Sequence, residues 1–429
     1  MIPKNLIHRI KDLSQKSLVQ GTAWLLLAKG SRIFIQAAYF ILIARALGTE
    51  QYGAFAGVVA LIGILTPFSS WGAENILVKH VSRNPTLFST YWGNALLTTS
   101  ISGTILLILA QILGGLVLPD EIPPALIFLV GLSDLIFLRF IDASSKSFLA
   151  VDKIKRTAQI NILLSLKNMV AAIVLVQFYI QPQVLDWAIL YLISTAIAAA
   201  VAVYMVSIIV GKPKPVPALI GPSMKEGFYF SIGLSSQTIY NDIDKTMLAS
   251  LGTLGATGIY AAAFRIITVA FVPVQALLAA GYAKFFKHGE KGIKGSWGLA
   301  KRLIPVSVLY ASLCTIGLML FAPLIPYILG EDYREAVLAI RWLSPLLILK
   351  SVSYFAADTL TGAGFQGVRS GIQMGIAGLN CVLNLWWIPI FSWQGAAWST
   401  LLCDGLLAAL LWGVVWYYYR LQKDQEKLD

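Results

Sequence analysis

The sequence predicts an all-α membrane protein with about twelve transmembrane helices. Apolar residues make up 57% of the 429 residues and charged residues only 13%, a balance that soluble domains do not show. Runs of roughly twenty mostly apolar residues recur along the chain, for example at 52–71 and 92–118, and each can cross a hydrocarbon core of about 30 Å. These runs are much longer than the roughly 10-residue strands of a membrane barrel, so the spans are predicted to be helices.

The apolar runs predict two halves of six spans each. The segment 211–226, which contains Lys-Pro-Lys-Pro, falls near the midpoint and is typical of a linker. We therefore expect an N-terminal lobe, 1–213, with an amphipathic arm and spans 1–6, and a C-terminal lobe, 214–429, with spans 7–12. Weak internal similarity at an offset of about 205 residues favours duplicated, pseudo-symmetric six-helix lobes. The spans are expected at 19–44, 52–77, 92–118, 125–149, 158–180, 186–210, 227–250, 257–283, 303–329, 336–360, 371–391 and 395–419.

The charges of the loops predict the orientation of the chain. Basic residues occupy the N-terminal arm, the linker, the loop 284–302 and the C-terminal tail, whereas acidic residues dominate the opposite loops. By the positive-inside rule the basic side is cytoplasmic, which predicts a multi-pass protein of the cell inner (plasma) membrane with both termini in the cytoplasm. Because the net charge of +12 follows from this topology, we expect membrane lipids and no nucleic acid as partners.

The sequence shows no pattern of a soluble enzyme. His8, His80 and His288 all fall in predicted cytoplasmic segments, and no glycine-rich phosphate loop precedes a Lys-Ser or Lys-Thr pair. The three cysteines lie inside predicted spans without the spacing of a disulfide framework or of zinc ligands. We therefore expect no enzymatic activity, no catalytic residue, no metal site and no cofactor.

Ionisable residues inside the predicted spans are the main indication of function in the sequence. A charge at the bilayer centre costs at least about 2.5 kcal/mol, so it normally faces the interior of the bundle or a wet cavity. For Arg341, near the end of its span, snorkelling to the surface is the favoured interpretation. The cations are Lys29, Arg32, Arg139, Lys167, Lys245, Arg265, Arg341 and Lys350, and the acids are Glu74, Asp134, Asp142, Asp242, Asp244, Asp358 and Asp404.

Two spans arrange polar and charged residues in a stripe. Lys29, Arg32 and Gln36 share one face of the first span, and a stripe from Ser231 to Lys245 follows one face of the seventh. If the lobes are duplicated, these two helices are equivalent and face each other across a cleft. The excess of fixed positive charge favours an anionic ligand such as a phosphate or pyrophosphate. The alternative is that the cations form structural ion pairs with acids of the spans.

Two sets of candidate residues follow from these charges. Asp242, Asp244 and Lys245 have a second interpretation, in which they only neutralise one another. The candidates for binding pyrophosphate or sugar are Lys29, Arg32, Arg139, Lys167, Lys245 and Arg265. The candidates for coupling to a proton or sodium ion are Asp134, Asp242 and Asp244.

Several motifs, taken in order, resemble those of a known transporter family. They are Ile43-Ala-Arg-Ala-Leu-Gly-Thr-Glu-Gln-Tyr-Gly53, Asn241-Asp-Ile-Asp-Lys-Thr-Met-Leu248, Gly258-Ile-Tyr-Ala-Ala-Ala-Phe-Arg265, a Phe-Ala-Pro-Leu-Ile-Pro stretch within 321–333 and an Ile-Pro pair within 384–397. The chain is similar in these places to the polysaccharide-transporter branch, with the Wzx-type O-antigen flippases, of the multidrug/oligosaccharidyl-lipid/polysaccharide exporter superfamily. The resemblance covers nearly the whole chain.

The resemblance implies a V-shaped, two-lobed bundle that gives alternating access. Its implied cargo is an undecaprenyl-pyrophosphate-linked oligosaccharide repeat unit, moved from the cytoplasmic to the periplasmic leaflet and driven by an ion gradient. It also implies a cationic cavity, to which Lys29, Arg32 and Lys245 would contribute. Polysaccharide polymerase or assembly proteins are expected as further partners.

Two other functions are considered beside the flippase. A drug/cation antiporter of the related multidrug branch would favour a cavity dominated by acidic residues, whereas the balance here leans basic. A non-transporting scaffold of a polysaccharide-assembly complex would offer its partners only loops, because no sizeable soluble domain is predicted.

Overall fold

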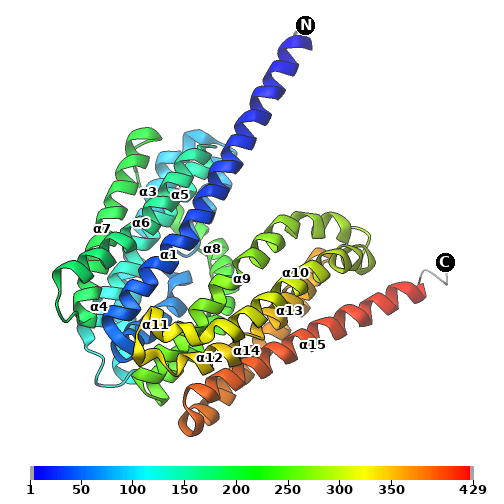
Figure 1. Ribbon diagram of the computed structural model, residues 1–429. Helices are drawn as coiled ribbons and strands as arrows, with labels where there is room; N and C mark the ends of the chain where they lie inside the picture. Colours follow the sequence, from blue (N-terminus) through cyan, green and yellow to red (C-terminus); the bar gives the residue numbers. More distant parts are fainter. Residues whose placement is uncertain (1–3, 426–429) are drawn as a thin grey trace. The chain divides into compact units, whose positions relative to one another are not determined.

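The computed structural model describes the backbone of residues 4–425 and the side chains of residues 34–221, 227–228, 231 and 241–424. In this part of the chain the regular secondary structure is helical throughout, without strands (Figure 1). Ten helices are long and apolar enough to cross a membrane among the residues that could be searched. One of them, Phe34–Val81, covers parts of two predicted spans, and helix α8 (Ile220–Leu251) coincides with a further one. The prediction of an all-α protein with about twelve spans is confirmed.

Exposed apolar stripes along the helices identify the lipid-facing surface. On α3 (Phe88–Val117), the exposed residues Ile101, Ile105, Ile108 and Ile112 recur at helical spacing, while small and polar residues of the same helix are buried. A soluble protein would not leave such a surface in water. The chain is therefore a multi-pass membrane protein.

The chain divides into two compact units. The first consists of residues 1–46 and 61–235, and the second of residues 47–60 and 236–429. This grouping assigns residues 52–60, the first part of the second predicted span, to the second unit. It also places the later boundary between the units after residue 235, beyond the predicted linker 211–226. The duplicated lobes 1–213 and 214–429 stay a prediction.

The first unit is a bundle built on small buried residues. Helices α5, α6 and α7 pack against one another, and α3 packs against α2 and α4. Trp92, Phe148 and Ile160 belong to a core that also contains alanines of α7. Its helices, beside most of α1 (Lys4–Ser69) and α3, are α2 (Ala73–Val81), α4 (Pro124–Leu132), α5 (Leu138–Ala150), α6 (Ile154–Phe178) and α7 (Val184–Ile209).

The segment that the sequence identifies as a linker lies against α3. The Lys214 N–H donates to the Ser89 carbonyl at 2.8 Å, and the Val216 N–H donates to the Asn94 Oδ1 at 2.7 Å. Between these two bonds, Gly93 lets the linker come so close that a Cβ there would lie 2.4 Å from the Pro215 nitrogen. The Lys-Pro-Lys-Pro segment is therefore docked on the first unit rather than free of it.

The second unit is a bundle of longer helices. Helix α13 packs against α9, α10 and α15, and α14 packs against α15. Buried Ile293, Leu360, Cys403 and Leu411 belong to its core. Its helices, beside the second half of α8, are α9 (Leu254–Gly289), α10 (Ile293–Phe321), α11 (Ile325–Leu329), α12 (Ala336–Leu343), α13 (Leu346–Gly362), α14 (Gln366–Phe391) and α15 (Trp393–Gln425).

A glycine pair lets two helices of the second unit cross in backbone contact. A Cβ on Gly53 of α1 would lie 1.8 Å from the Leu254 carbonyl oxygen, and one on Gly258 of α9 would lie 1.9 Å from the Thr49 carbonyl oxygen. Gly53 begins a Gly-x-x-x-Gly pattern that ends at Gly57, which is typical of close helix crossings in membranes. The two helices have no room for a side chain at this crossing.

Just before this crossing, a loop of the second unit forms a hydrogen bond with the backbone of α1. Gly48 interrupts α1 with a φ of 70°, and its carbonyl accepts a hydrogen bond of 3.1 Å from the Tyr333 hydroxyl. Burial raises the pKa of the Tyr333 phenol, which therefore remains a donor. The break at Gly48 thus has a defined geometry.

Candidate functional site

A buried polar cluster in the first unit is built on an irregular helical turn. Asp134 lies in η2 (Ser133–Phe137), a π-helical turn between α4 and α5. The Ser69 hydroxyl donates to the carbonyl of Leu135 in this turn, and the Ser102 hydroxyl donates to the Ser69 carbonyl at 2.5 Å. Such turns are frequent at functional sites because they displace a side chain from the regular helical register.

Asp134 and Lys167 meet through Tyr191. The Tyr191 hydroxyl donates to Asp134 Oδ1 at 2.7 Å, and the Lys167 ammonium lies 4.2 Å from the centre of the Tyr191 ring. The ammonium also donates to Asn168 Oδ1 and Thr195 Oγ1, each at 2.7 Å, and Lys167 is only 6% exposed. In the described part of the chain no carboxylate lies within 4.0 Å of it. Neutral oxygens and an aromatic face hold this cation.

Arg139 belongs to a separate ion pair. Its guanidinium contacts the Asp142 carboxylate at 2.9 Å, one turn along α5. This pair fits the structural alternative that the sequence left open. Its charges are only partly buried, so the attraction is screened and contributes little to stability.

The polar stripe of the seventh predicted span continues into the second unit. Lys245 forms an ion pair of 2.5 Å with Asp242, three residues earlier on α8, and its ammonium lies 4.3 Å from the centre of the Phe264 ring. The neutralisation that the sequence considered for Asp242 and Lys245 is therefore present in the structure. Asp244 accepts a hydrogen bond of 2.8 Å from the Lys245 backbone N–H, and its other partners lie on other helices.

Asp244 is the centre of a second buried cluster. It is 2% exposed and accepts a hydrogen bond from the Tyr260 hydroxyl of α9. Tyr260 also lies 3.1 Å from the Thr400 hydroxyl of α15, so three helices converge on one carboxylate. This arrangement surrounds a buried carboxyl group with hydroxyl groups of two other helices.

Two charged residues near Asp244 are not among the candidates for binding or coupling, although the sequence also offers Asp404 as a proton or cation site. Lys350 of α13 is 9% exposed, donates to Asn241 Oδ1 at 3.3 Å and lies 5.0 Å from the centre of the Phe264 ring. Asp404 of α15 is 1% exposed. Both residues belong to the intramembrane charges of the sequence. Their burial results from the packing of the helices, which hydropathy does not predict.

The remaining binding candidates are Lys29, Arg32 and Arg265. The side chains of Lys29 and Arg32 lie outside the described residues, so their predicted role stays a prediction. Arg265 is half-buried on α9. Exposed Arg341 donates to the Met319 carbonyl at 3.2 Å, which agrees with its predicted position at the edge of the span. Among the described residues no group of three His, Cys, Asp or Glu side chains could hold a metal ion.

Replacing Tyr260 by phenylalanine is expected to destabilise the second unit by about 1–3 kcal/mol, because a buried carboxylate loses its hydroxyl donor. Thermal unfolding of the purified protein in lipid nanodiscs measures this loss. Tyr282→Phe, at an exposed position of the same helix, is the matched control and should unfold as the native protein does. Equal melting temperatures for Tyr260→Phe and the control would show that the hydroxyl of Tyr260 does not hold Asp244.

The fold is similar to that of solved membrane transporters. The structure matches an inward-facing multidrug resistance MATE family transporter of the MOP superfamily, with a TM-score of 0.73 and 16% identity over 91% of this chain and 96% of the other. It also matches the lipid II flippase MurJ in an inward closed conformation, with a TM-score of 0.73 and 13% identity over 91% of this chain and 87% of the other. At this level of identity the similarities concern the fold alone.

The sequence identifies the family within this class. Residues 18–281 match the family described as "Polysaccharide biosynthesis protein", which is more than half of the chain. The chain belongs to this family. The search among curated proteins gave no match. The expected resemblance is thus confirmed at the level of family and fold.

Proposed function

We propose that the protein is a flippase for undecaprenyl-pyrophosphate-linked O-antigen or related polysaccharide repeat units. It would move them from the cytoplasmic to the periplasmic leaflet of the inner membrane by alternating access, with both termini in the cytoplasm. The observation that carries the proposal is the buried Lys167, an intramembrane cation held by neutral oxygens and an aromatic ring in a protein of the polysaccharide family.

The chemistry of the cargo supports this choice. A lipid-linked oligosaccharide combines a pyrophosphate, a neutral glycan and a prenyl chain, so its transporter needs cations, hydrogen-bonding groups and access to lipid. Lys29 and Arg32 are proposed to bind the pyrophosphate, together with cations of the other lobe such as Lys245 and Arg265. Arginine and lysine bind such anions by bidentate bonds and as point charges, respectively.

Coupling to an ion gradient is the second part of the proposal. Asp134 and Asp244 are each buried and each accept a hydrogen bond from a tyrosine hydroxyl. Binding of a proton or sodium ion at either carboxyl group would change the charge balance against Lys167 or Lys350. Asp242, already paired with Lys245, is the weaker candidate.

Removal of the first-span cations tests the flippase proposal. In a flippase-null strain that expresses this chain with its cognate glycan pathway, Lys29→Ala and Arg32→Ala are each expected to lower surface glycan by at least about ten-fold, because one charged hydrogen bond to the pyrophosphate is lost. Protein level, followed by immunoblot, should not change. Lys29→Arg preserves the charge and should retain most of the export.

Arg83→Ala is the control, because Arg83 is an exposed arginine of a loop. Full surface glycan in both first-span variants would refute the cationic site. A native chain that produces no surface glycan, yet protects a pump-deficient strain against cationic drugs, would instead identify an antiporter.

A further inference from the structure

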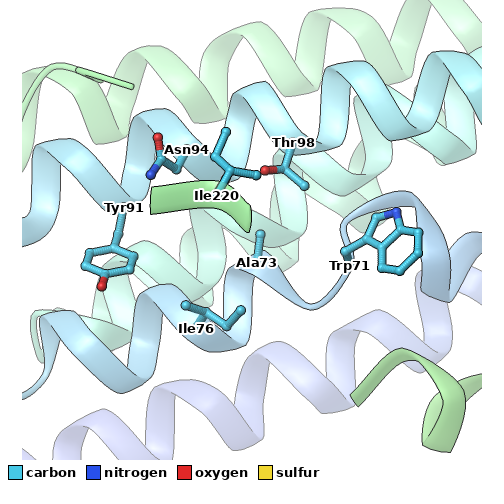
Figure 2. A pocket seen from close by; sticks show the side chains of 8 residues that line it. Trp71, Ala73, Ile76, Tyr91, Asn94, Thr98 and Ile220 are labelled. Atoms are coloured by element: carbon cyan, nitrogen blue, oxygen red, sulfur yellow. The ribbon is translucent and has the colours of Figure 1, made fainter. Parts of the chain in front are cut away.

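A small cavity in the first unit has room for about one water molecule. It lies beside Trp71, Tyr91, Asn94 and Ile220 (Figure 2) and has a volume of about 20 Å³. This space does not admit a sugar ring or a phosphate group. A candidate site of another kind lies on the surface of the second unit.

Two hydrogen bonds connect the end of α15 to the turn between α9 and α10. The Gln422 Nε2 donates to the Lys291 carbonyl at 2.9 Å, and the Lys294 N–H donates to the Gln422 Oε1 at 3.2 Å. Since the amide donates with its nitrogen and accepts with its oxygen, its orientation is fixed. The last turns of α15 therefore lie against a turn that is far away in the sequence.

Gly292 makes room for this amide. Its φ of 75° lies in the left-handed region that favours glycine, and it is the residue directly before α10. A Cβ at this position would lie 2.7 Å from the Gln422 side-chain nitrogen, so a larger residue would displace the amide. The shape of the turn thus depends on glycine and admits Gln422.

Aromatic contacts hold the preceding turns of α15. The Trp412 indole N–H donates to the Val352 carbonyl at 3.1 Å, and its ring lies edge-on to Trp297 with ring centres 4.9 Å apart. Tyr418 is stacked on Phe365, with ring centres 4.0 Å apart. Together with the bonds of Gln422, these contacts fix the direction in which α15 continues beyond its span.

The contact between the two segments gathers positive charge. Within the described residues 290–302 and 420–424, six cations stand against two acids, Glu290 and Asp424. All of these cations except the half-buried Lys294 are exposed. We call this group the basic platform; it consists of Lys291, Lys294, Lys301, Arg302, Arg420 and Lys423.

Two cations of the basic platform lie on tryptophan rings. The Arg420 guanidinium is 3.5 Å from the centre of the Trp416 ring, and the Lys301 ammonium is 4.9 Å from the centre of the Trp297 ring. Trp416 is itself exposed. Tryptophan is enriched where a membrane meets water, so these contacts favour a position of the platform at the level of the lipid headgroups.

An exposed apolar stripe on α10 begins at the basic platform. Arg302 is followed at the spacing i+4, i+7, i+11 and i+14 by Val306, Leu309, Leu313 and Ile316, all of which are exposed. These residues share one face of the helix, and their exposure identifies that face as lipid-facing. A lipid whose chains lie along this stripe would bring its headgroup to Arg302.

Charge decides which lipid fits best. Cations near a membrane surface attract anionic headgroups, whereas the ammonium group of a zwitterionic lipid offsets the charge of its phosphate. An acidic segment of a soluble partner would match the charge of the platform but would not cover the apolar stripe. The combination of charge and stripe therefore favours an anionic phospholipid.

We propose that the basic platform binds the headgroup of an anionic phospholipid, whose acyl chains lie along the exposed stripe of α10. The lipid belongs to the leaflet on the proposed cytoplasmic side. Gln422 is the positioning residue of this site, because it keeps Arg420 and Lys423 beside the cations of α10. The site is separate from the proposed cargo and does not depend on which glycan is transported.

Lipid retention by the purified full-length protein tests this inference. Native mass spectrometry is measured in detergent with equal amounts of phosphatidylglycerol and phosphatidylcholine, and the native protein should retain phosphatidylglycerol preferentially. Lys301→Gln with Arg302→Gln, and separately Arg420→Gln with Lys423→Gln, should each weaken its apparent affinity by about ten-fold, because two cations are lost.

Two further variants distinguish a defined site from attraction by net charge. Gln422→Ala keeps every charge but releases the end of α15, and should weaken phosphatidylglycerol by about three-fold. Lys155→Gln with Arg156→Gln removes two exposed cations at the beginning of α6 in the first unit and should leave its retention unchanged.

Equal retention of the two lipids by the native protein would overturn the inference. It would also be overturned if the variant of α6 lost as much phosphatidylglycerol as the two platform variants, or if Gln422→Ala retained it as the native protein does.

Discussion

Replacing Gly258 by alanine is expected to abolish export of surface glycan and to lower the melting temperature of the protein. The new Cβ would lie 1.9 Å from the Thr49 carbonyl oxygen, so α1 and α9 would have to move apart along their backbones. Overpacking of side chains alone costs about 1–3 kcal/mol, and a backbone cannot relax as a flexible side chain can. Thermal unfolding in nanodiscs and a surface-glycan assay in the flippase-null strain measure the two effects.

Gly255→Ala is the matched control for this variant. Gly255 lies one turn earlier on α9, and a Cβ there would meet only the Thr49 hydroxyl, at 3.9 Å. The control should therefore unfold and export as the native protein does. Native stability of Gly258→Ala would mean that the two helices do not cross in backbone contact at this point.

Replacing Lys167 by methionine is expected to destabilise the first unit by about 3 kcal/mol or more, because the charge balance of a buried site is broken. The substitution leaves Asn168 and Thr195 without their donor and removes one of the cations near Asp134. Export of surface glycan should be lost together with stability. A single variant therefore cannot tell a structural role of Lys167 from a functional one.

A double variant separates these roles. Lys167→Met combined with Asp134→Asn makes both positions neutral, so thermal stability should recover relative to either single variant. If the charges take part in transport, surface glycan should remain absent although the protein is stable again. Recovery of both stability and export would show that Lys167 and Asp134 have only a structural role. Arg334→Gln with Glu331→Gln is the control, since that ion pair is exposed.

Local spacing allowed the sequence to predict part of the site. Asp242 and Lys245 are three residues apart on one helix, so their ion pair follows from helical geometry, and the structure contains it. Spans and lipid-facing stripes follow equally from the order of apolar residues. For features of this kind the relevant neighbours lie within one or two turns of the chain.

Contacts between distant segments were not accessible in this way. Asp244, Tyr260 and Thr400 meet only because three helices pack together, and no local pattern connects α8 with α15. The π-helical turn at Asp134 depends on hydroxyl groups of other helices. The sequence therefore identified the residues that are unusual in a membrane, but it could not predict which of them contact one another.

The linker shows the same limit. The prolines and lysines of 212–215 correctly mark a break between spans, but the contact of this segment with Gly93 depends on the path of the chain.

The glycine crossing also has a consequence for the origin of the chain. Gly53 and Gly258 are 205 residues apart, and so are the residues whose carbonyls they meet, Thr49 and Leu254. Each glycine therefore contacts the carbonyl four residues before the other, which is the reciprocity of an isologous contact in a two-fold symmetric dimer. A half-length ancestor could have made this contact with a second copy of itself before gene fusion joined the two copies, and an interface between subunits would then have become an internal crossing.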